Sequence, residues 1–401
     1  MTARNYQYIV VGGGLAGASA VEGIRERDKQ GSVLLISREA HLPYDRPPLS
    51  KKLWFGKKTL ESIFLHDGAY YHNAGISVQL ATTVTAIDSA KKTVTDDQGK
   101  VHGYDKLLLA TGGAPRRLAI TGGDLDGISY FRTLDDYLLL RQGAKEGATA
   151  VVIGGGFIGS EIAAALAITK VKVTMLFPEP YLVSRVFPAG LGKAIQERYR
   201  EKGVTILNGE TPVSFSRKES RFVTVTSAGR SLESDLVVVG IGIQPSLNLA
   251  EKTGIRTGNG IVVNELLQTS IPDIYAAGDN AFFPYQALET SMRVEHWDNA
   301  LNQGKAAGRN MAGAASPYAY MPYFFSDLFE FGYEAVGEVD ARLDVVADWV
   351  KENDTGVLYY LKGGKVRGAM MCNVWEKVEA ARQLIRSGET VAPASLIGRI
   401  R

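Results

Sequence analysis

Residues 6–24 read YQYIVVGGGLAGASAVEGI, and residues 148–167 read ATAVVIGGGFIGSEIAAALA. Each segment has an apolar run, then glycines spaced G-x-G-x-x-G, then small and apolar residues in a helical pattern. This order predicts a strand, a tight turn and a helix. The glycines are Gly12, Gly14 and Gly17 in the first segment and Gly154, Gly156 and Gly159 in the second.

The spacing of these glycines has a chemical reason. The first allows the tight turn, the second lets a pyrophosphate approach the backbone, and the third lets the helix pack closely on the strand. The N-terminus of the helix then presents free N–H groups and the positive end of the helix dipole to the anion. One such motif is also compatible with a glycine-rich turn that binds nothing, whereas two motifs in the same context indicate two dinucleotide sites.

An acidic residue about 20 positions past the last glycine commonly binds a ribose in such units. After Gly17, the apolar stretch at residues 32–37 is followed by Arg38 and Glu39, and Glu179 follows the corresponding stretch after Gly159. Glu39 and Glu179 are therefore the candidate ribose ligands, and an ordinary surface charge is the alternative for each.

Two further segments flank the second glycine motif. Residues 106–118 read KLLLATGGAPRRL and residues 271–283 read IPDIYAAGDNAFF, each a strand followed by a turn. Because the second motif lies between them, we predict an α/β fold in which one Rossmann-like dinucleotide-binding domain is inserted in another. From about Tyr320, alternating strands closed by a helix predict a small α+β domain. The predicted domains are 1–118 with 247–318, then 119–246, then 319–401.

The composition excludes several classes of protein. The chain has 401 residues, which suits two or three domains, and its net charge of +2 argues against a nucleic-acid binder. Cys372 is the only cysteine, so neither an intrachain disulfide nor a redox-active dithiol can form. The five histidines lack metal-ligand spacing, so no metal site is expected.

The sequence also leads to an expectation about location. No apolar run is long enough to span a bilayer. Strand-like sequence begins at about Tyr6, which leaves no room for a targeting peptide. We therefore expect a cytoplasmic protein.

Together these segments resemble the FAD-dependent pyridine-nucleotide oxidoreductases, and within them the branch with apoptosis-inducing factor and the oxygenase-coupled ferredoxin reductases. The resemblance covers nearly the whole chain, and its most specific part is LPYDRPPLSKKLW at residues 42–54. Other matching phrases are GGGFIGSE (154–161), LFPEP (176–180), RVEHWDNALNQG (293–304) and FGYEAVGEVD (331–340). The resemblance implies FAD and NAD(H) as cofactors, with a hydride passing from NADH to FAD.

The resemblance also implies which residues bind the two cofactors. Arg46 would lie near the FAD phosphates or adenosine, and Asp279 would contact the ribityl–phosphate part. Further implied FAD contacts are Thr111, Gly112, Gly278, Glu295, His296 and Trp297. The implied NAD contacts outside the glycine turn are Glu179, Arg185 and Gly242.

Five residues are implied to lie at the flavin ring. Lys51 and Glu161 match a lysine–glutamate pair beside the ring, and we expect a salt bridge between them. Phe157 matches an aromatic residue that covers the nicotinamide face, while His296 and Trp297 match residues at the other end. Residue type alone allows other interpretations. A helix could begin at about Lys51, and both Lys51 and Glu161 could be surface charges. Phe157, His296 and Trp297 could be packing elements.

The chain departs from the family pattern at two positions. Arg38 stands where relatives often have an acid, and Gln244 stands where the apoptosis-inducing factor pattern has a glutamate. The long C-terminal insertion of that pattern is absent between Asp340 and Gly356, so a DNA-binding or apoptotic role is not expected.

Three functions stay open from the sequence. The first is an apoptosis-inducing factor-like NADH oxidoreductase, whose acceptor could be a ferredoxin, a rubredoxin, a quinone or oxygen. The second is a dedicated ferredoxin or rubredoxin reductase. The third is an interaction module whose dimerisation responds to NADH, which leaves room for a homodimer. NADH is expected to be preferred over NADPH because Glu179 would repel a 2′-phosphate, although Arg185 could stack on the adenine or attract that phosphate.

Overall fold

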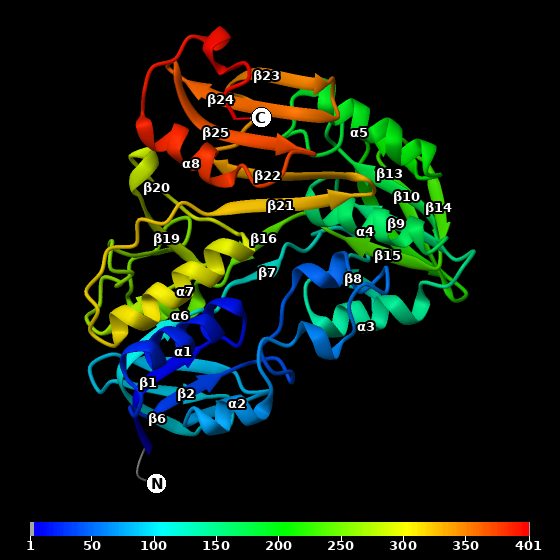
Figure 1. The fold of residues 1–401 in the computed structure, drawn as a ribbon. Helices are drawn as coiled ribbons and strands as arrows, with labels where there is room; N and C mark the ends of the chain where they lie inside the picture. The colour runs from blue at the N-terminus through cyan, green and yellow to red at the C-terminus, as the bar shows by residue number, and fades with distance from the viewer. Residues whose placement is uncertain (1–3, 401) are drawn as a thin grey trace. The chain divides into compact units, whose positions relative to one another are not determined.

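The computed structural model describes residues 4–400, and its contacts divide the chain into two compact units (Figure 1). Unit 1 consists of the chain up to Asp45, Leu60–Ala114 and Pro245–Tyr323. Unit 2 consists of Arg46–Thr59, Pro115–Gln244 and the chain from Phe324 onward. Among the described residues, no helix has the length and apolar character that crossing a membrane requires.

Unit 1 is built on a seven-stranded sheet in the order β3-β2-β1-β6-β5-β4, with β18 also paired to β6. The strands are β1 (Arg4–Val11), β2 (Val33–Ile36), β3 (Ile76–Gln79), β4 (Val84–Asp88), β5 (Thr93–Asp96), β6 (Val101–Leu109) and β18 (Ile274–Ala276). The first three strands, β6 and β18 are parallel, whereas β4 and β5 form an antiparallel extension. The apolar runs of β1 and β2 are buried without alternation, as parallel strands covered on both faces require.

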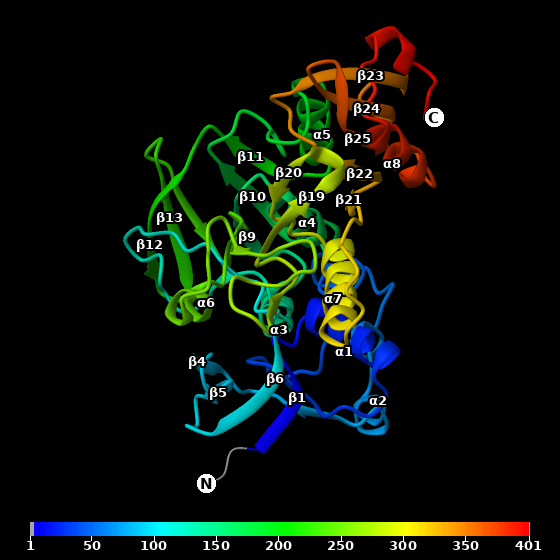
Figure 2. The same ribbon diagram turned by 90° about the vertical axis from the view of Figure 1, so that its left-hand side faces the viewer.

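Helices α1 (Leu15–Arg27) and α7 (Trp297–Met311) lie side by side in unit 1, as both views show (Figures 1 and 2). Glycines on α7 make this packing close. A Cβ on Gly304 would lie 2.2 Å from a backbone oxygen of α1, and one on Gly308 would lie 2.0 Å from another. Only glycine fits at these two positions, so the helix backbones meet directly.

The remaining elements of unit 1 are short. Helix α2 begins at an Asp67 cap, whose carboxylate accepts a hydrogen bond from the Tyr70 N–H at 2.8 Å. These elements are α2 (Gly68–Asn73), α6 (Asn248–Thr253), η2 (Glu61–Ile63), η3 (Gln286–Leu288) and a three-stranded sheet of β17 (Ile261–Val262), β19 (Ala281–Tyr285) and β20 (Thr290–Met292).

Unit 2 contains a second parallel sheet in the order β11-β10-β9-β15-β8. Its strands are β8 (Ile128–Tyr130), β9 (Thr149–Ile153), β10 (Lys172–Phe177), β11 (Thr205–Asn208) and β15 (Leu236–Val239). Its helices are α3 (Leu134–Gly143), α4 (Phe157–Ile168) and α5 (Ala189–Glu201). One buried cluster joins this sheet to a smaller one and contains Tyr130, Val151, Ile153, Leu176, Phe215, Phe222, Val237 and Val239.

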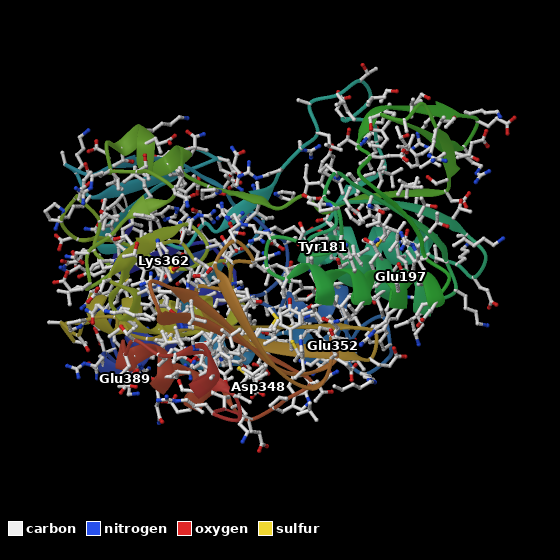
Figure 3. The ribbon with its side chains drawn as sticks, turned by 90° about the horizontal axis from the view of Figure 1, so that it is seen from above. Tyr181, Glu197, Asp348, Glu352, Lys362 and Glu389 are labelled. Carbon is white, nitrogen blue, oxygen red and sulfur yellow. The ribbon has the colours of Figure 1, made fainter. Side chains whose placement is uncertain are left out.

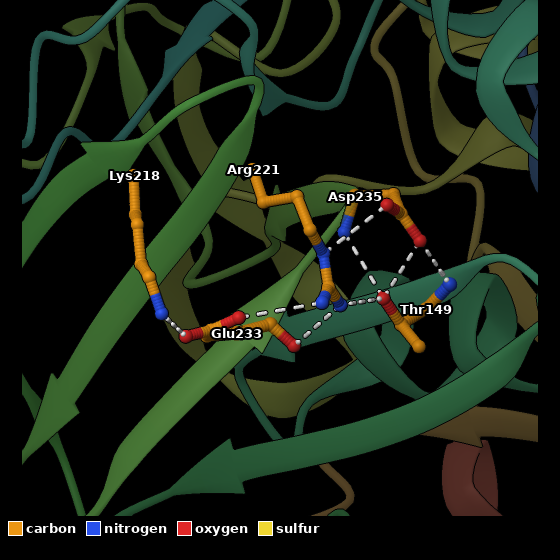
Figure 4. Close-up of polar contacts among 5 residues, drawn as sticks. All are labelled: Thr149, Lys218, Arg221, Glu233 and Asp235. Carbon is orange, nitrogen blue, oxygen red and sulfur yellow. Dashed lines mark hydrogen bonds and ion pairs between the residues drawn. The ribbon is translucent and has the colours of Figure 1, made fainter.

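The smaller sheet is antiparallel and consists of β12 (Pro212–Lys218), β13 (Arg221–Thr226) and β14 (Ser231–Ser234). A polar network fixes it to the parallel sheet (Figure 4). The Arg221 guanidinium donates to the Thr149 hydroxyl at 3.0 Å and lies 3.4 Å from a carboxylate oxygen of Glu233. The Asp235 carboxylate accepts from the Thr149 N–H at 2.8 Å. The network is half-exposed, so it adds orientation more than stability.

A five-stranded sheet in the order β21-β22-β25-β24-β23 ends the chain. Gly363 and Gly364 connect β24 to β25 with φ values of +58° and +74°, which is the two-residue hairpin turn that favours glycine. This part of unit 2 consists of β21 (Tyr323–Leu328), β22 (Phe331–Gly337), β23 (Asp344–Lys351), β24 (Thr355–Lys362), β25 (Lys365–Cys372), α8 (Val378–Ser387) and η4 (Pro393–Leu396). The expected α+β arrangement is confirmed.

The segment Arg46–Thr59 belongs to unit 2. The Trp54 ring packs edge-on against Tyr137 of α3, with ring centroids 5.4 Å apart. A 3-10 helix, η1, covers Pro47–Ser50. The expectation of a helix beginning near Lys51 is therefore wrong, because the two prolines start the helical turn earlier and Lys51 follows its end.

The predicted fold class is confirmed, since both glycine motifs lie between a strand and a helix and the second falls in a segment inserted between parts of unit 1. Two short strands, β7 (Gly113–Pro115) and β16 (Ile243–Pro245), pair where the chain passes from one unit to the other. The predicted division into three domains with the boundaries given above stays a prediction.

Substituting Gly304→Ala should destabilise unit 1. The added methyl group would overlap backbone of α1 at 2.2 Å, and overpacking of this kind costs about 1–3 kcal/mol. Thermal unfolding would measure the loss as a lower Tm. Gly68→Ala is the matched control, because a Cβ there meets nothing within 4 Å. Equal Tm values for the two variants would contradict the account of the α1–α7 contact.

Candidate functional site

The first glycine turn has the geometry of an anion site. Gly12 has φ +123°, and a Cβ there would lie 2.1 Å from the Ala110 carbonyl oxygen. A Cβ on Gly17 would lie 1.9 Å from the Gly12 carbonyl oxygen, whereas one on Gly14 would meet nothing within 4 Å. Gly14 is the N-cap of α1, and no side chain caps the helix. The N–H groups at this helix start are therefore open to a pyrophosphate.

Polar groups of unit 1 lie around the Gly278 turn. The Gly278 N–H donates to Gln303 Oε1 at 2.8 Å, and Asn280 Nδ2 donates to Thr111 Oγ1 at 3.0 Å. Within residues 4–400, the buried atoms Gln303 Nε2 and Asn280 Oδ1 have no hydrogen-bond partner. Because buried polar atoms are usually hydrogen-bonded, the surroundings of the Gly278 turn suit a polar ligand such as FAD. The sequence reasoning missed Asn280 and Gln303, although both belong to phrases it had singled out.

The other residues proposed for FAD are engaged with neighbours. Glu39 is half-buried and accepts a hydrogen bond from the Tyr44 hydroxyl, while Arg38 is exposed. Glu295 is exposed and forms an ion pair with Arg293. Glu39 thus has the better position of the two residues after β2 for a ribose contact.

His296 and Trp297 lie at the start of α7 in unit 1. His296 is the N-cap residue, and no side chain caps the helix. Burial lowers the pKa of His296 to about 4, although the Asp279 carboxylate acts in the opposite direction. The imidazole is therefore neutral near pH 7. The Trp297 indole donates to the Asp45 carboxylate at 2.8 Å, which fixes the ring.

The second glycine turn, in unit 2, repeats the geometry of the first. Gly154 has φ +115°, and a Cβ there would lie 2.4 Å from the Gly240 carbonyl oxygen. A Cβ on Gly156 would meet nothing within 4 Å, and Gly156 is the N-cap of α4 without a side-chain cap. Gly242 has φ +91°, and its carbonyl accepts from the Arg116 N–H at 3.0 Å. This turn is likewise open to a pyrophosphate.

The expected salt bridge between Lys51 and Glu161 is present. Lys51 Nζ lies 3.0 Å from Glu161 Oε1, and the two side chains are only 7% exposed. The Glu161 carboxylate also accepts from the Ser50 hydroxyl at 2.5 Å and from the Ser326 hydroxyl at 2.5 Å. Three separate parts of the sequence therefore converge on one buried carboxylate, and the carboxylate is well satisfied.

Lys51 has further partners on β21. Its ammonium lies 4.6 Å from the centroid of the Phe325 ring and donates to the Phe325 carbonyl at 3.4 Å. Phe157, in the first turn of α4, contacts the Phe324 ring with centroids 5.7 Å apart. Neighbouring residues of β21 thus contact both the ammonium and the Phe157 ring.

Sequence reasoning missed Ser50, Ser326, Phe324 and Phe325. A polar residue inside the aromatic stretch YFFSDL could have indicated Ser326, because a serine in such a strand needs a buried partner. By contrast, Glu179 and Arg185 are exposed beyond the end of β10. Glu179 and Arg185 are therefore accessible, and the structure does not bring them to the Lys51–Glu161 ion pair. Arg46, another predicted FAD contact, donates to the Arg132 carbonyl at 2.9 Å.

Replacing Lys51 alone should be costly to the fold. Lys51→Met leaves the Glu161 charge buried without its cation, which costs about 3 kcal/mol, while Lys51→Met with Glu161→Gln removes both charges and should recover much of that loss. Chemical denaturation would measure the difference. Lys91→Met is the matched control, since its ion pair with Asp88 is exposed and screened by solvent, so its removal should change the stability little. The coupling would be contradicted if the stability lost by the double variant equalled the sum of the losses in Lys51→Met and Glu161→Gln, each made alone.

Comparison with known proteins agrees with these two turns. Residues 6–304 match the family described as pyridine nucleotide-disulphide oxidoreductase, and residues 307–355 match the C-terminal domain of apoptosis-inducing factor. Apoptosis-inducing factor 1, mitochondrial, from Dictyostelium discoideum is 34% identical over 97% of this chain and 80% of its own length. Rubredoxin-NAD(+) reductase from Pseudomonas putida is 34% identical over 82% of this chain and 86% of its own.

A solved structure covers nearly the whole fold. The crystal structure of the covalent putidaredoxin reductase–putidaredoxin complex contains a chain that superposes with a TM-score of 0.91 and 32% identity. The match covers 98% of this chain and 96% of that one.

Proposed function

Because the chain belongs to the pyridine nucleotide-disulphide oxidoreductase family, we propose that it is an FAD-dependent enzyme that oxidises NADH and passes the electrons to a separate acceptor. The observation that carries the proposal is the pair of glycine turns, each with an open helix N-terminus and both within the matched residues 6–304. We assign FAD to the turn of unit 1 and NADH to the turn of unit 2.

Bound FAD supplies the ring that accepts a hydride from the nicotinamide. The protein has to hold the two rings at contact distance, exclude water and stabilise the negative charge that develops. Lys51 suits the last task, because Glu161 and Phe325 fix its ammonium in a buried position. Phe157 would cover the nicotinamide face of the flavin. The uncapped start of α7 at His296 would present the positive end of the helix dipole to the negative charge on the reduced flavin.

The route of the electrons beyond the flavin follows from the cysteine count. The sequence holds one cysteine, Cys372, and burial raises the pKa of its thiol. An intrachain dithiol relay, to which the family name refers, therefore cannot operate. The acceptor must meet the flavin without such a relay.

A small iron–sulfur protein is the acceptor class that the comparisons favour. The structural relative above was solved in covalent complex with putidaredoxin, and the curated relative is a rubredoxin reductase. Apoptosis-inducing factor 1 from Dictyostelium discoideum is equally similar in sequence. An apoptosis-inducing factor-like oxidoreductase that passes electrons to a quinone or oxygen is therefore our second proposal. An interaction module that dimerises on reduction, the three-domain division and a cytoplasmic location remain proposals.

The proposal is tested by anaerobic stopped-flow mixing with NADH. Flavin released by heat should run as FAD on chromatography, and the bound flavin should lose its absorbance within the mixing experiment. Lys51→Ala and Glu161→Ala should retain FAD and reduce it about 10–100-fold more slowly, because a displaced ring loses hydride-transfer geometry. FMN, no flavin, or normal reduction in both variants would count against the proposed roles.

A second mixing step separates the acceptors. Prompt reoxidation by a ferredoxin or rubredoxin favours the reductase reading, and reoxidation only by a quinone or oxygen favours the apoptosis-inducing factor-like reading. A long-lived reduced form whose sedimentation changes favours the interaction module.

NADH should be used more efficiently than NADPH. The exposed Glu179 carboxylate would accept hydrogen bonds from the adenine ribose and repel a 2′-phosphate. Glu179→Ala should narrow the difference in kcat/KM by about tenfold, which is 1.4 kcal/mol. Glu197→Ala, on α5 in the same unit, is the control (Figure 3). Equal or better use of NADPH by the unmodified protein would reject this assignment.

A further inference from the structure

Residues 179–187 connect β10 to α5 in unit 2 and contain an unusual backbone conformation. Val183 has φ +53°, a left-handed value, and its side chain is 5% exposed. A β-branched residue is strongly disfavoured there. Such strain persists only where the surroundings fix it, and it concentrates at ligand sites and clamps. The question is what holds Val183 in place.

One set of contacts joins the segment to the second glycine turn. The Val183 N–H donates to the Gly155 carbonyl at 2.8 Å. The Val183 carbonyl accepts from the N–H groups of Val186 and Phe187, each at 2.9 Å. The strained residue therefore connects the segment that carries Glu179 to the turn assigned to the pyrophosphate.

A second set of contacts joins the same segment to the C-terminal sheet. The Ala341 N–H donates to the Arg185 carbonyl at 2.9 Å, and the Tyr360 hydroxyl donates to the Val186 carbonyl at 2.8 Å. Tyr360 and Val186 are both buried. The pKa of Asp340 is lowered mainly by its hydrogen bond with Arg342, and the charge of Arg185 adds to the effect. This agrees with the proximity of Arg185 to residues 340–341.

The following helix is tied to the same sheet. Arg198 on α5 donates to the Asn353 carbonyl at 3.1 Å and forms an ion pair with Asp354 at 2.7 Å. Figure 3 shows the labelled Tyr181 at the start of the segment and Glu352 in the β23–β24 turn, on the side of the sheet toward α5. The segment thus lies between two fixed points, the glycine turn and the C-terminal sheet.

We propose that Tyr360 is a positioning residue for the adenosine half of the nicotinamide dinucleotide. By holding the Val186 carbonyl, it keeps residues 179–187 against Gly155 and so presets the position of Glu179 relative to the pyrophosphate turn. This inference rests on the proposed assignment of NADH to unit 2. A preorganised segment binds its ligand without first being ordered, so the effect falls on affinity.

The test is calorimetric titration of the FAD-loaded protein with ADP-ribose, which carries the adenosine and pyrophosphate but no nicotinamide. Tyr360→Phe removes only the hydroxyl group. Loss of one hydrogen bond of ordinary strength should raise the Kd for ADP-ribose about 3- to 10-fold. The KM for NADH should rise in parallel, while the limiting rate of flavin reduction and the FAD content should not follow.

Tyr359→Phe is the matched control, since Tyr359 is also buried on β24 and its side chain alternates to the other face of the sheet. An unchanged Kd in Tyr360→Phe would overturn the inference, and so would an equal rise in Tyr359→Phe, which would indicate general loosening of the sheet. If the unmodified protein binds no ADP-ribose while NADH still reduces the flavin, only the positioning role and the assigned site fail. If NADH does not reduce it either, the proposed function fails as well.

Discussion

A buried carboxylate at the start of α4 sets the constraint that organises unit 2. Glu161 carries a charge that the interior cannot tolerate alone, so cationic and hydroxyl donors must reach it. They come from the end of η1 and from β21, in the form of Lys51, Ser50 and Ser326. The contacts that stabilise the Glu161 charge therefore bring together α4, the end of η1 and β21, which are far apart in the sequence. It also fixes the Lys51 ammonium in a buried position, as the proposed hydride-transfer site requires.

The fold could be read from the sequence because its signals are local. The turns at Gly12 and Gly154 require positive φ and close backbone contact, and only glycine satisfies both requirements. The Lys51–Glu161 pair came from family resemblance, since each residue alone looks like a surface charge. Ser326 was missed because its only signal is its place inside an aromatic strand, and no recurring spacing marks it. The helix expected at Lys51 was wrong because the preceding prolines move the helical turn upstream.

The C-terminal sheet contains no glycine motif, yet it contributes to both ends of the second dinucleotide region. Strand β21 supplies Ser326 to the ion pair, and β24 supplies Tyr360 to the segment after β10. A sheet with such contacts is more than a cover for unit 2. An aromatic contact adds to these polar ones, because Phe187 of the segment after β10 packs edge-on against Tyr333 of β22, with ring centroids 5.4 Å apart. Long-range pairing of this kind cannot be seen in local sequence patterns.

The close packing of α1 on α7 has a consequence for biosynthesis. Helix α1 ends at Arg27, but α7, whose Gly304 and Gly308 pack against it, ends only at Met311. A ribosome adding about 5–20 residues per second needs roughly 15–60 seconds to make the intervening chain. During that interval the first glycine turn has emerged while its supporting helix has not. The nascent protein therefore completes unit 1, to which we assign FAD, late in translation, and the face of α1 that packs on α7 stays uncovered until then.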